Sequence, residues 1–186
     1  MKKQKGLVYV FTGDGKGKTS AALGIVARAV CNKMKVAFVA WYKEESWPIS
    51  EKELPARINP AGAEGELEMY FMGEGFYKLP TDKATPEEHK KSAKKALKKA
   101  KSLLGRVDVL VMDEVVKAIA DGLIDEKEVV RVVEKRGKTH VVLTGRGLVT
   151  GSGPVSLMKV ADLATECRKI KHPFDKGVKA VKGLDF

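Results

Sequence analysis

The sequence contains few cysteines, no long apolar run and no recognisable leader segment. Its two cysteines, Cys31 and Cys167, lie far apart and lack the spacing of a metal-binding pair, so we expect buried free thiols. No run approaches the ~18 apolar residues of a membrane span. The basic start, Lys2-Lys3-Gln4-Lys5, precedes an apolar run that is too short for a signal peptide. These absences predict a cytoplasmic protein that has no membrane partner.

Acidic residues are also scarce relative to basic ones. The chain has 35 Lys and Arg residues against 24 Asp and Glu residues, which gives a formal net charge of +11. Such an excess suits polyanionic partners, namely nucleotide phosphates, nucleic acid or an anionic membrane, without choosing between them. With 186 residues, of which 44% are apolar, the chain is long enough for one good core. We therefore expect a single domain over residues 1–186.

Apolar runs alternate with helical stretches along the whole chain. Most of the apolar runs are nearly continuous, as expected for strands that are covered on both faces. The predicted strands are 7–11, 36–41, 67–72, 107–112, 141–143 and, more weakly, 165–170; the predicted helices are 19–30, 87–104, 126–135 and 155–164. This alternation is typical of an α/β fold with a mostly parallel sheet and helices on both faces. Ligands of such sheets bind beyond the carboxyl ends of the strands.

Two segments leave alternatives open. The helix after Thr85, with Pro86 at its first position and Glu88 completing a capping box, carries one lysine-rich face: Lys90, Lys91, Lys94, Lys95, Lys98 and Lys101. That face could bind nucleic acid, but no aromatic residues are interleaved for base stacking, which favours a solvated amphipathic helix. Residues 44–66 are irregular, and Trp47 within them would either cover a ligand or pack the loop down.

The motif that carries most information is a glycine loop between the first predicted strand and helix. It reads Thr12-Gly13-Asp14-Gly15-Lys16-Gly17-Lys18-Thr19-Ser20. The strict phosphate-loop pattern would have glycine at position 12, but the Gly-Lys-Thr end and both flanks agree with it. Glycines let backbone N–H groups turn inward around an anion, and the next helix points its positive dipole end there. Lys18 would bind phosphate oxygens, and the Thr19 hydroxyl would reach Mg²⁺.

Further polar residues close two of the later strands. Asp113 and Glu114 end a buried strand, and an acid in that place usually anchors magnesium; the alternative is a helix cap. Arg146, in Thr144-Gly145-Arg146-Gly147, would clamp a phosphate or form a structural salt bridge. No residue stands out as a covalent nucleophile, which fits chemistry in which a bound ligand attacks and the protein positions it.

Together these motifs resemble a known family, the P-loop class of ATP:corrinoid adenosyltransferases. The resemblance runs over nearly the whole chain and is carried by the glycine loop, Ala27-Arg28-Ala29, Gly73-Glu74-Gly75-Phe76, Met112-Asp113-Glu114, Thr144–Gly147 and Lys171–Ala180. It implies a P-loop NTPase-like fold of the RecA type. It also implies that the Co(I) of a reduced corrinoid attacks C5′ of ATP and releases triphosphate. Threonine at position 12 is usual in that family.

The resemblance also implies roles for particular residues. Lys18 and Glu114 would be catalytic, and Thr19, Glu114 and Asp113 would hold Mg²⁺, with Mn²⁺ as a substitute. ATP would be bound by Gly13, Asp14, Gly15, Lys16, Gly17, Lys18, Thr19, Ser20, Arg28, Arg146, Lys171, His172, Asp175 and Lys179. The corrinoid would contact Phe76. Position 78 holds Lys78 where the family has an aromatic residue, so the aromatic wall would be rebuilt by Tyr77, Trp47 or Trp41, or it would be absent.

The resemblance further implies a homodimer and a separate electron-donating flavoprotein, with no nucleic-acid partner. Two other functions share the same loop. One is a P-loop ATPase or kinase that transfers the γ-phosphoryl group, and the other is a RecA-like nucleic-acid-binding ATPase, suggested by the net positive charge.

Overall fold

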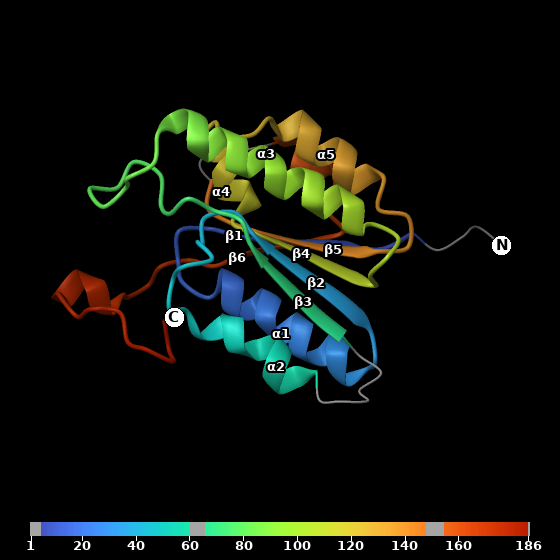
Figure 1. Cartoon of the computed structure of the whole chain (residues 1–186), viewed down its shortest axis with the longest axis horizontal. Helices are drawn as coiled ribbons and strands as arrows, with labels where there is room; N and C mark the ends of the chain where they lie inside the picture. Colours follow the sequence, from blue (N-terminus) through green and yellow to red (C-terminus); the bar gives the residue numbers. More distant parts are fainter. Residues whose placement is uncertain (1–4, 60–65, 148–154, 186) are drawn as a thin grey trace.

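A six-stranded, all-parallel sheet forms the centre of the molecule (Figure 1). The computed structural model describes residues 5–59, 66–147 and 155–185. The strands are β1 (Val8–Thr12), β2 (Lys35–Ala40), β3 (Glu66–Phe71), β4 (Val109–Asp113), β5 (His140–Thr144) and β6 (Leu163–Glu166). Their order across the sheet is β3-β2-β4-β5-β1-β6. Strand β5 therefore lies between β1, which leads into the glycine loop, and β4, which ends in Asp113.

Helices cover both faces of this sheet. Figure 1 shows α3 (Pro86–Leu103), α4 (Val115–Ala120) and α5 (Glu126–Glu134) on one face, and α1 (Lys18–Cys31) and α2 (Leu54–Ile58) on the other. The short helix α6 (Val155–Val160) packs against α5. Two 3₁₀ turns, η1 (Ser50–Glu53) and η2 (Pro173–Lys176), complete the described elements. The layered α/β architecture predicted from the alternation is confirmed.

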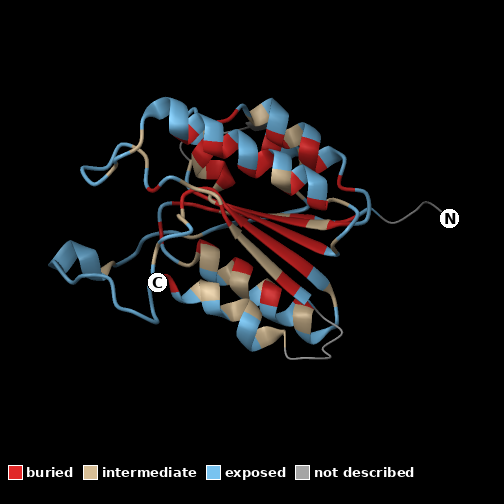
Figure 2. Cartoon of the chain, viewed as in Figure 1, coloured by how far each residue is buried: buried red, intermediate tan, exposed pale blue. Residues whose placement is uncertain are grey.

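The core consists of apolar layers on the two faces of the sheet. Residues 36–40 of β2 and all of β4 are buried, because helices cover these central strands on both sides. Figure 2 shows the burial concentrated in the strands and in the inward faces of the helices, whereas the chain after β6 is exposed. Because both faces of the sheet are covered, the apolar runs in the sequence are continuous rather than alternating.

The structure departs from several of the predicted elements. Strand β6 begins at Leu163, two residues before the predicted one, and α6 ends at Val160 rather than at residue 164. All four residues of β6 are exposed at the sheet edge, so the strand carries little apolar signal. Helices α2 and α4 were not predicted, because five or six residues are too few to display a helical period. Part of the predicted 155–164 helix thus lies in β6.

Two local predictions have different outcomes. The capping box of α3 is confirmed: the Thr85 hydroxyl accepts a hydrogen bond from the Glu88 N–H, and the Glu88 carboxylate accepts one from the Thr85 N–H. Both cysteines are free, as predicted, but the expectation that they are buried is wrong. Cys31 is exposed at the end of α1, and Cys167 is half-buried because it follows the edge strand.

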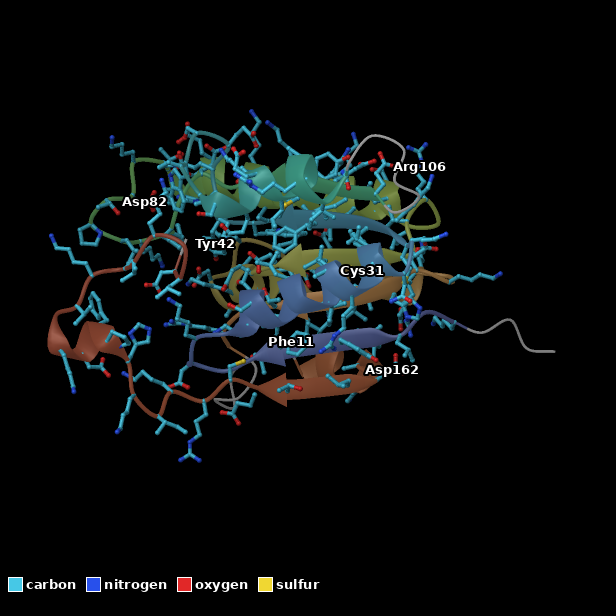
Figure 3. The ribbon with its side chains drawn as sticks, turned by 90° about the horizontal axis from the view of Figure 1, so that it is seen from below. Phe11, Cys31, Tyr42, Asp82, Arg106 and Asp162 are labelled. Carbon is cyan, nitrogen blue, oxygen red and sulfur yellow. The ribbon has the colours of Figure 1, made fainter. Side chains whose placement is uncertain are left out.

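All strands end at the same edge of the sheet, which brings distant segments together. In Figure 3, Phe11 and Tyr42 lie toward the carboxyl ends of the strands, and Arg106 and Asp162 lie toward the amino ends. The glycine loop follows β1, Asp113 ends β4 and Thr144 ends β5. The parallel arrangement alone therefore assembles these residues into one site.

Candidate functional site

The glycine loop runs from β1 to α1 and packs closely against the backbone that follows β6. A Cβ on Gly13 would lie 2.5 Å from the Cys167 carbonyl oxygen, and one on Gly15 would lie 2.6 Å from the Arg168 carbonyl carbon. The Gly15 N–H donates a hydrogen bond of 2.6 Å to the Cys167 carbonyl. Gly17 caps α1 with a φ of 111°, in the left-handed region. The glycines are therefore required both by close packing and by backbone conformation.

Lys18 opens α1 and turns back across the loop. The side chain is buried, and its Nζ donates a hydrogen bond of 2.5 Å to the Gly15 carbonyl. Burial lowers the pKa of Lys18, and the nearby Glu114 carboxylate opposes that shift. The ammonium thus lies at the helix N-terminus, where an anion would be bound by backbone N–H groups and the lysine together.

Asp113 connects the glycine loop to the end of β5. Its Oδ1 accepts a hydrogen bond of 2.9 Å from the Thr19 hydroxyl and one of 2.8 Å from the Thr144 hydroxyl. The carboxylate is buried, and within the described chain Oδ2 has no hydrogen-bond partner. One oxygen of Asp113 is therefore held by neutral donors, while the other accepts no hydrogen bond and faces the Lys43 ammonium at 3.6 Å.

Glu114 occupies a constrained position beside Asp113. Its φ of 62° places it in the left-handed region, which is unusual for a residue other than glycine, and its N–H donates to the Thr144 hydroxyl at 2.8 Å. Burial and the charge of Asp113 raise the pKa of Glu114 to about 7. Its Oε2 is buried and lacks a hydrogen-bond partner among the described residues. Such strain is typical of functional sites.

These oxygens fit Mg²⁺ bound together with phosphate. Asp113 Oδ2, which lies 3.6 Å from Lys43 Nζ, and Glu114 Oε2 are buried oxygen atoms that accept no hydrogen bond from the described residues. The Thr19 hydroxyl lies 2.9 Å from Asp113 Oδ1. Hard oxygen ligands are those that Mg²⁺ prefers, and it is often bound by one or two carboxylates plus substrate phosphates. The described part of the chain holds no cluster of three or more His, Cys, Asp or Glu residues that would form an all-protein metal cage. The donor set therefore fits a metal that arrives with a nucleotide.

A cleft of about 600 Å³ opens over these groups. Its lining comes from the glycine loop, the ends of β2, β4 and β5, the 44–58 segment, and the end of the chain: Gly15, Lys16, Gly17, Lys18, Thr19, Ser20, Leu23, Tyr42, Lys43, Ser50, Glu51, Leu54, Phe76, Asp113, Glu114, Arg146, His172, Gly183, Leu184 and Asp185. Lys16 forms an ion pair with Asp185 there. Eleven of the residues expected at the site from the sequence line this one cleft.

Aromatic side chains gather at the other end of the cleft. Phe76, which is 42% exposed, stacks on Tyr42 with ring centroids 6.1 Å apart and meets Trp47 at 5.3 Å. Tyr77 packs edge-on against His89 at 5.1 Å instead of lining the cleft. Tyr42 is buried and donates a hydrogen bond of 2.5 Å to Asp121. Phe76 and Trp47 are thus brought together as expected, and Tyr42 replaces Tyr77 beside them.

Several residues expected at the nucleotide lie away from the cleft. Arg28 is in the last turn of α1 and lines a separate depression of about 300 Å³ at the amino ends of the strands. Asp14 is exposed and accepts a hydrogen bond from the Lys169 N–H. Lys171, Asp175 and Lys179 are exposed on the chain after β6, where Asp175 pairs with Lys169. Only His172 of that stretch lines the cleft.

Sequence reasoning missed a buried ion pair in the cleft wall. Lys43 Nζ donates a hydrogen bond of 2.8 Å to Glu51 and lies 3.6 Å from Asp113 Oδ2. Both side chains are largely buried. A signal was present, because Lys43 follows the carboxyl end of β2 just as Asp113 ends β4. The rule that located the acid would also have located this lysine.

The parallel sheet, the glycine loop and the lysine and acid beside it define a P-loop nucleotide-binding protein. The chain matches the family described as ATP:corrinoid adenosyltransferase BtuR/CobO/CobP over residues 4–186. It is 38% identical to the corrinoid adenosyltransferase of a Sinorhizobium species, over 98% of this chain and 81% of that protein. It is 33% identical to that of Escherichia coli K12, over 98% and 87%. The chain therefore belongs to the ATP:corrinoid adenosyltransferase family, enzymes that use ATP to adenosylate corrinoids.

Solved structures with a similar fold have low sequence identity to this chain. The ATP synthase subunit NeqB of Nanoarchaeum equitans aligns with a TM-score of 0.54 at 14% identity, over 93% of this chain and 47% of that one. The likeness concerns the fold alone. It agrees with the P-loop NTPase-like fold that the sequence predicts.

Proposed function

We propose that the cleft holds ATP with its triphosphate in the glycine loop and its ribose facing the aromatic end. The cobalt of a reduced corrinoid then attacks C5′, the new Co–C bond forms, and the C5′–O bond breaks with its electron pair on the triphosphate. The observation that supports this most directly is that one cleft contains both the glycine loop and Phe76, an exposed ring that packs on Tyr42 and Trp47. A γ-phosphoryl transferase would not need the aromatic end.

The glycine loop and Lys18 would stabilise the triphosphate as its charge increases. Backbone N–H groups, the dipole of α1 and the Lys18 ammonium are in place before the ligand binds, so they need little reorganisation during the reaction. Arg146 lies at the same end of the cleft and would add a further positive charge. His172 would close the loop from the side of the C-terminal segment.

Mg²⁺ would be held by Thr19, Asp113 and Glu114 together with phosphate oxygens. When bound, the ion supplies charge neutralisation to the departing triphosphate. Glu114 must lose its proton to serve as a ligand, and its pKa near 7 places that change in the neutral range. Mn²⁺ would fit the same oxygen donors.

The aromatic cluster of Phe76, Tyr42 and Trp47 would pack against the corrinoid. Phe76 projects from its partners with 42% exposure, which leaves ring surface for a flat macrocycle. A separate flavoprotein would supply the electrons that reduce the corrinoid, as the family resemblance implies. A homodimer in the cytoplasm is also part of the proposal. None of the described helices is long and apolar enough to span a membrane.

The remaining motif residues do not line the cleft. Arg28 is separated from Lys18 by most of α1, so a role at this chain's own nucleotide would require a large rearrangement. Lys171, Asp175 and Lys179 lie on an exposed segment whose neighbours, His172 and Asp185, already reach the cleft. Gly13, Asp14 and Tyr77 would act by supporting residues that line it.

Product analysis tests the proposal. The purified chain is given ATP, Mg²⁺ and a chemically reduced corrinoid, and we expect inorganic triphosphate together with a light-sensitive alkylcorrinoid. ADP as the sole nucleotide product would instead identify a phosphoryl transferase. Stimulation of ATP turnover by polynucleotides would favour a nucleic-acid-dependent ATPase, which neither the family nor the solvated lysine face of α3 favours.

A further inference from the structure

Lys43 is a buried cation that the proposed function leaves without a role. Its side chain lies in the cleft wall after β2, where Nζ donates a hydrogen bond of 2.8 Å to Glu51 Oε1. Only 18% of the Lys43 side chain and 14% of the Glu51 side chain are exposed. An ammonium group carries three N–H donors, and the bond to Glu51 uses one of them. Taking such a group out of water is costly unless it has further partners.

The two oxygens of Asp113 show where Lys43 stands relative to the phosphate loop. Oδ1 faces the hydroxyls of Thr19 and Thr144, whereas Oδ2 faces the Lys43 ammonium at 3.6 Å. Tyr42, the residue before Lys43, stacks against Phe76 of the aromatic cluster. Lys43 therefore lies between the two ends of the cleft, with the glycine loop on one side of it and the aromatic rings on the other.

The proposed reaction determines which part of ATP lies in the middle of the cleft, beside Lys43. Cobalt approaches C5′ from the aromatic end, and the bond that breaks joins C5′ to the oxygen of the α-phosphate. The terminal phosphates extend away from the corrinoid toward the glycine loop. The α-phosphate oxygen that receives the electron pair therefore has to lie near the middle of the cleft, beside Lys43.

We propose that Lys43 is a further triphosphate-binding lysine, whose ammonium contacts the α-phosphate end and stabilises the charge that develops on the departing oxygen. The inference rests on the proposed function and extends it to a residue outside the recognised motifs. Lys18 would bind the far end of the triphosphate and Lys43 the near end. Glu51 would hold the Lys43 side chain in place between turnovers.

The Lys43 ammonium lies between two carboxylates before any ligand binds. It donates a hydrogen bond of 2.8 Å to Glu51 Oε1 and lies 3.6 Å from Asp113 Oδ2, an oxygen that accepts no hydrogen bond from the described residues. Of its three N–H donors, the bond to Glu51 uses one, which leaves others for a phosphate oxygen.

Calorimetric titration with inorganic tripolyphosphate and Mg²⁺ tests the contact without corrinoid or catalysis. We expect Lys43→Met, which keeps the apolar stem, to weaken tripolyphosphate binding by at least about 10-fold, as for other hydrogen bonds to charged groups. Its kcat for adenosylation should fall by about 100-fold. Lys43→Arg should recover most of the affinity. The matched control is Lys52→Met, which removes a lysine of η1 whose Nζ lies over the Phe71 ring, 5.5 Å from its centroid, rather than in the cleft.

A second variant separates a ligand contact from a structural ion pair. If Lys43 only anchored the wall, Glu51→Gln would lower tripolyphosphate affinity as much as Lys43→Met; we expect it to lower affinity by less than about threefold, because the lysine charge remains. Equal losses in the two variants, or unchanged binding in a folded Lys43→Met protein, would overturn the inference. Failure of the unmodified chain to bind tripolyphosphate would instead count against the proposed function itself.

Discussion

The two ends of the cleft differ in how completely the protein builds them before a ligand binds. At the phosphate end, Lys18 and Asp113 are buried, and their side chains are hydrogen-bonded to Gly15, Thr19 and Thr144. At the aromatic end, Phe76 is 42% exposed and lies on a loop between β3 and α3. The first end is polar and its side chains are buried and hydrogen-bonded, while the second is open and apolar.

This difference matches the chemistry that each end would perform. Stabilising charge on a leaving group requires dipoles that are already oriented, because reorganising them during the reaction would cost free energy. Binding a large, flat macrocycle requires accessible apolar surface, and orienting that surface in advance matters less than orienting dipoles does. The phosphate end should therefore tolerate few substitutions, and the aromatic end should tolerate more.

The largest effect is expected from Lys18→Ala at the phosphate end. The ammonium donates a hydrogen bond to the Gly15 carbonyl at the start of α1, so its loss removes a positive charge from the proposed triphosphate site. We expect adenosylation to fall by about 1,000-fold or more, with ATP affinity lost in parallel. Initial rates of alkylcorrinoid formation measure the first effect and calorimetry the second. A variant that retained a tenth of the activity would show that this end is less dependent on Lys18 than its geometry suggests.

The next largest effect is expected from a comparison of two glycines, Gly15 in the glycine loop and Gly24 in α1. Gly15→Ala would place a Cβ 2.6 Å from the Arg168 backbone, so we expect about 100-fold weaker ATP binding and a loss of roughly 2 kcal/mol in the free energy of unfolding. Gly24→Ala is the control, because Gly24 is exposed inside α1 with nothing within 4 Å of a Cβ. It should raise that free energy by up to about 1 kcal/mol. Similar losses in both would mean that packing against residue 168 does not shape the loop.

Glu114→Gln should separate function from stability. We expect the rate at saturating ATP to fall by about 10- to 100-fold, with a higher Mg²⁺ requirement. In the unmodified chain, apparent Mg²⁺ affinity should rise as pH increases through about 7, because Glu114 then loses its proton. The variant should lack that dependence. Magnesium titrations of the rate at several pH values measure both.

The same variant should be more stable than the unmodified chain above neutral pH. The folded pKa of Glu114, about 7, exceeds the ordinary value of 4.5, so the folded state binds more protons between these values. Its contribution to stability is therefore present below pH 4.5 and is lost as pH rises through 7. Glu114→Gln removes this loss, and we expect a gain of about 1–3 kcal/mol at pH 8 by denaturant unfolding. Equal stability of the variant and the unmodified chain at pH 8 would contradict a raised pKa of Glu114.

The smallest effect is expected at the aromatic end, from Phe76→Ala. The corrinoid KM should rise by about 10-fold, while ATP affinity stays unchanged and stability changes by less than about 1 kcal/mol, because the ring is half-exposed. Leu79→Ala is a suitable control, since Leu79 is 50% exposed on the same loop and does not line the cleft. An effect on ATP binding as large as that on corrinoid binding would remove the distinction between the two ends.

Predictions from the sequence succeeded where the signal is local or periodic. The capping box at Thr85, the start of α1 and the buried strand that ends in Asp113 each depend on a few consecutive residues. They failed for α4, whose mostly apolar sequence reads as a continuation of β4, although the left-handed backbone of Glu114 turns the chain between them. They also failed to separate Tyr42 from Tyr77 as the aromatic partner of Phe76, because that choice depends on how two loops pack.

By itself, the sequence determined the phosphate loop and the family of the chain, because the loop's glycines, lysine and threonine are contiguous and their backbone geometry is local. Only the tertiary structure decided how Asp113 divides its two oxygens between Thr19 and Thr144 on one side and Lys43 on the other. That division depends on the strand order, which places the carboxyl ends of β2, β4, β5 and β1 next to one another. Residues more than 90 positions apart in sequence meet there, and neither spacing nor periodicity encodes such a meeting.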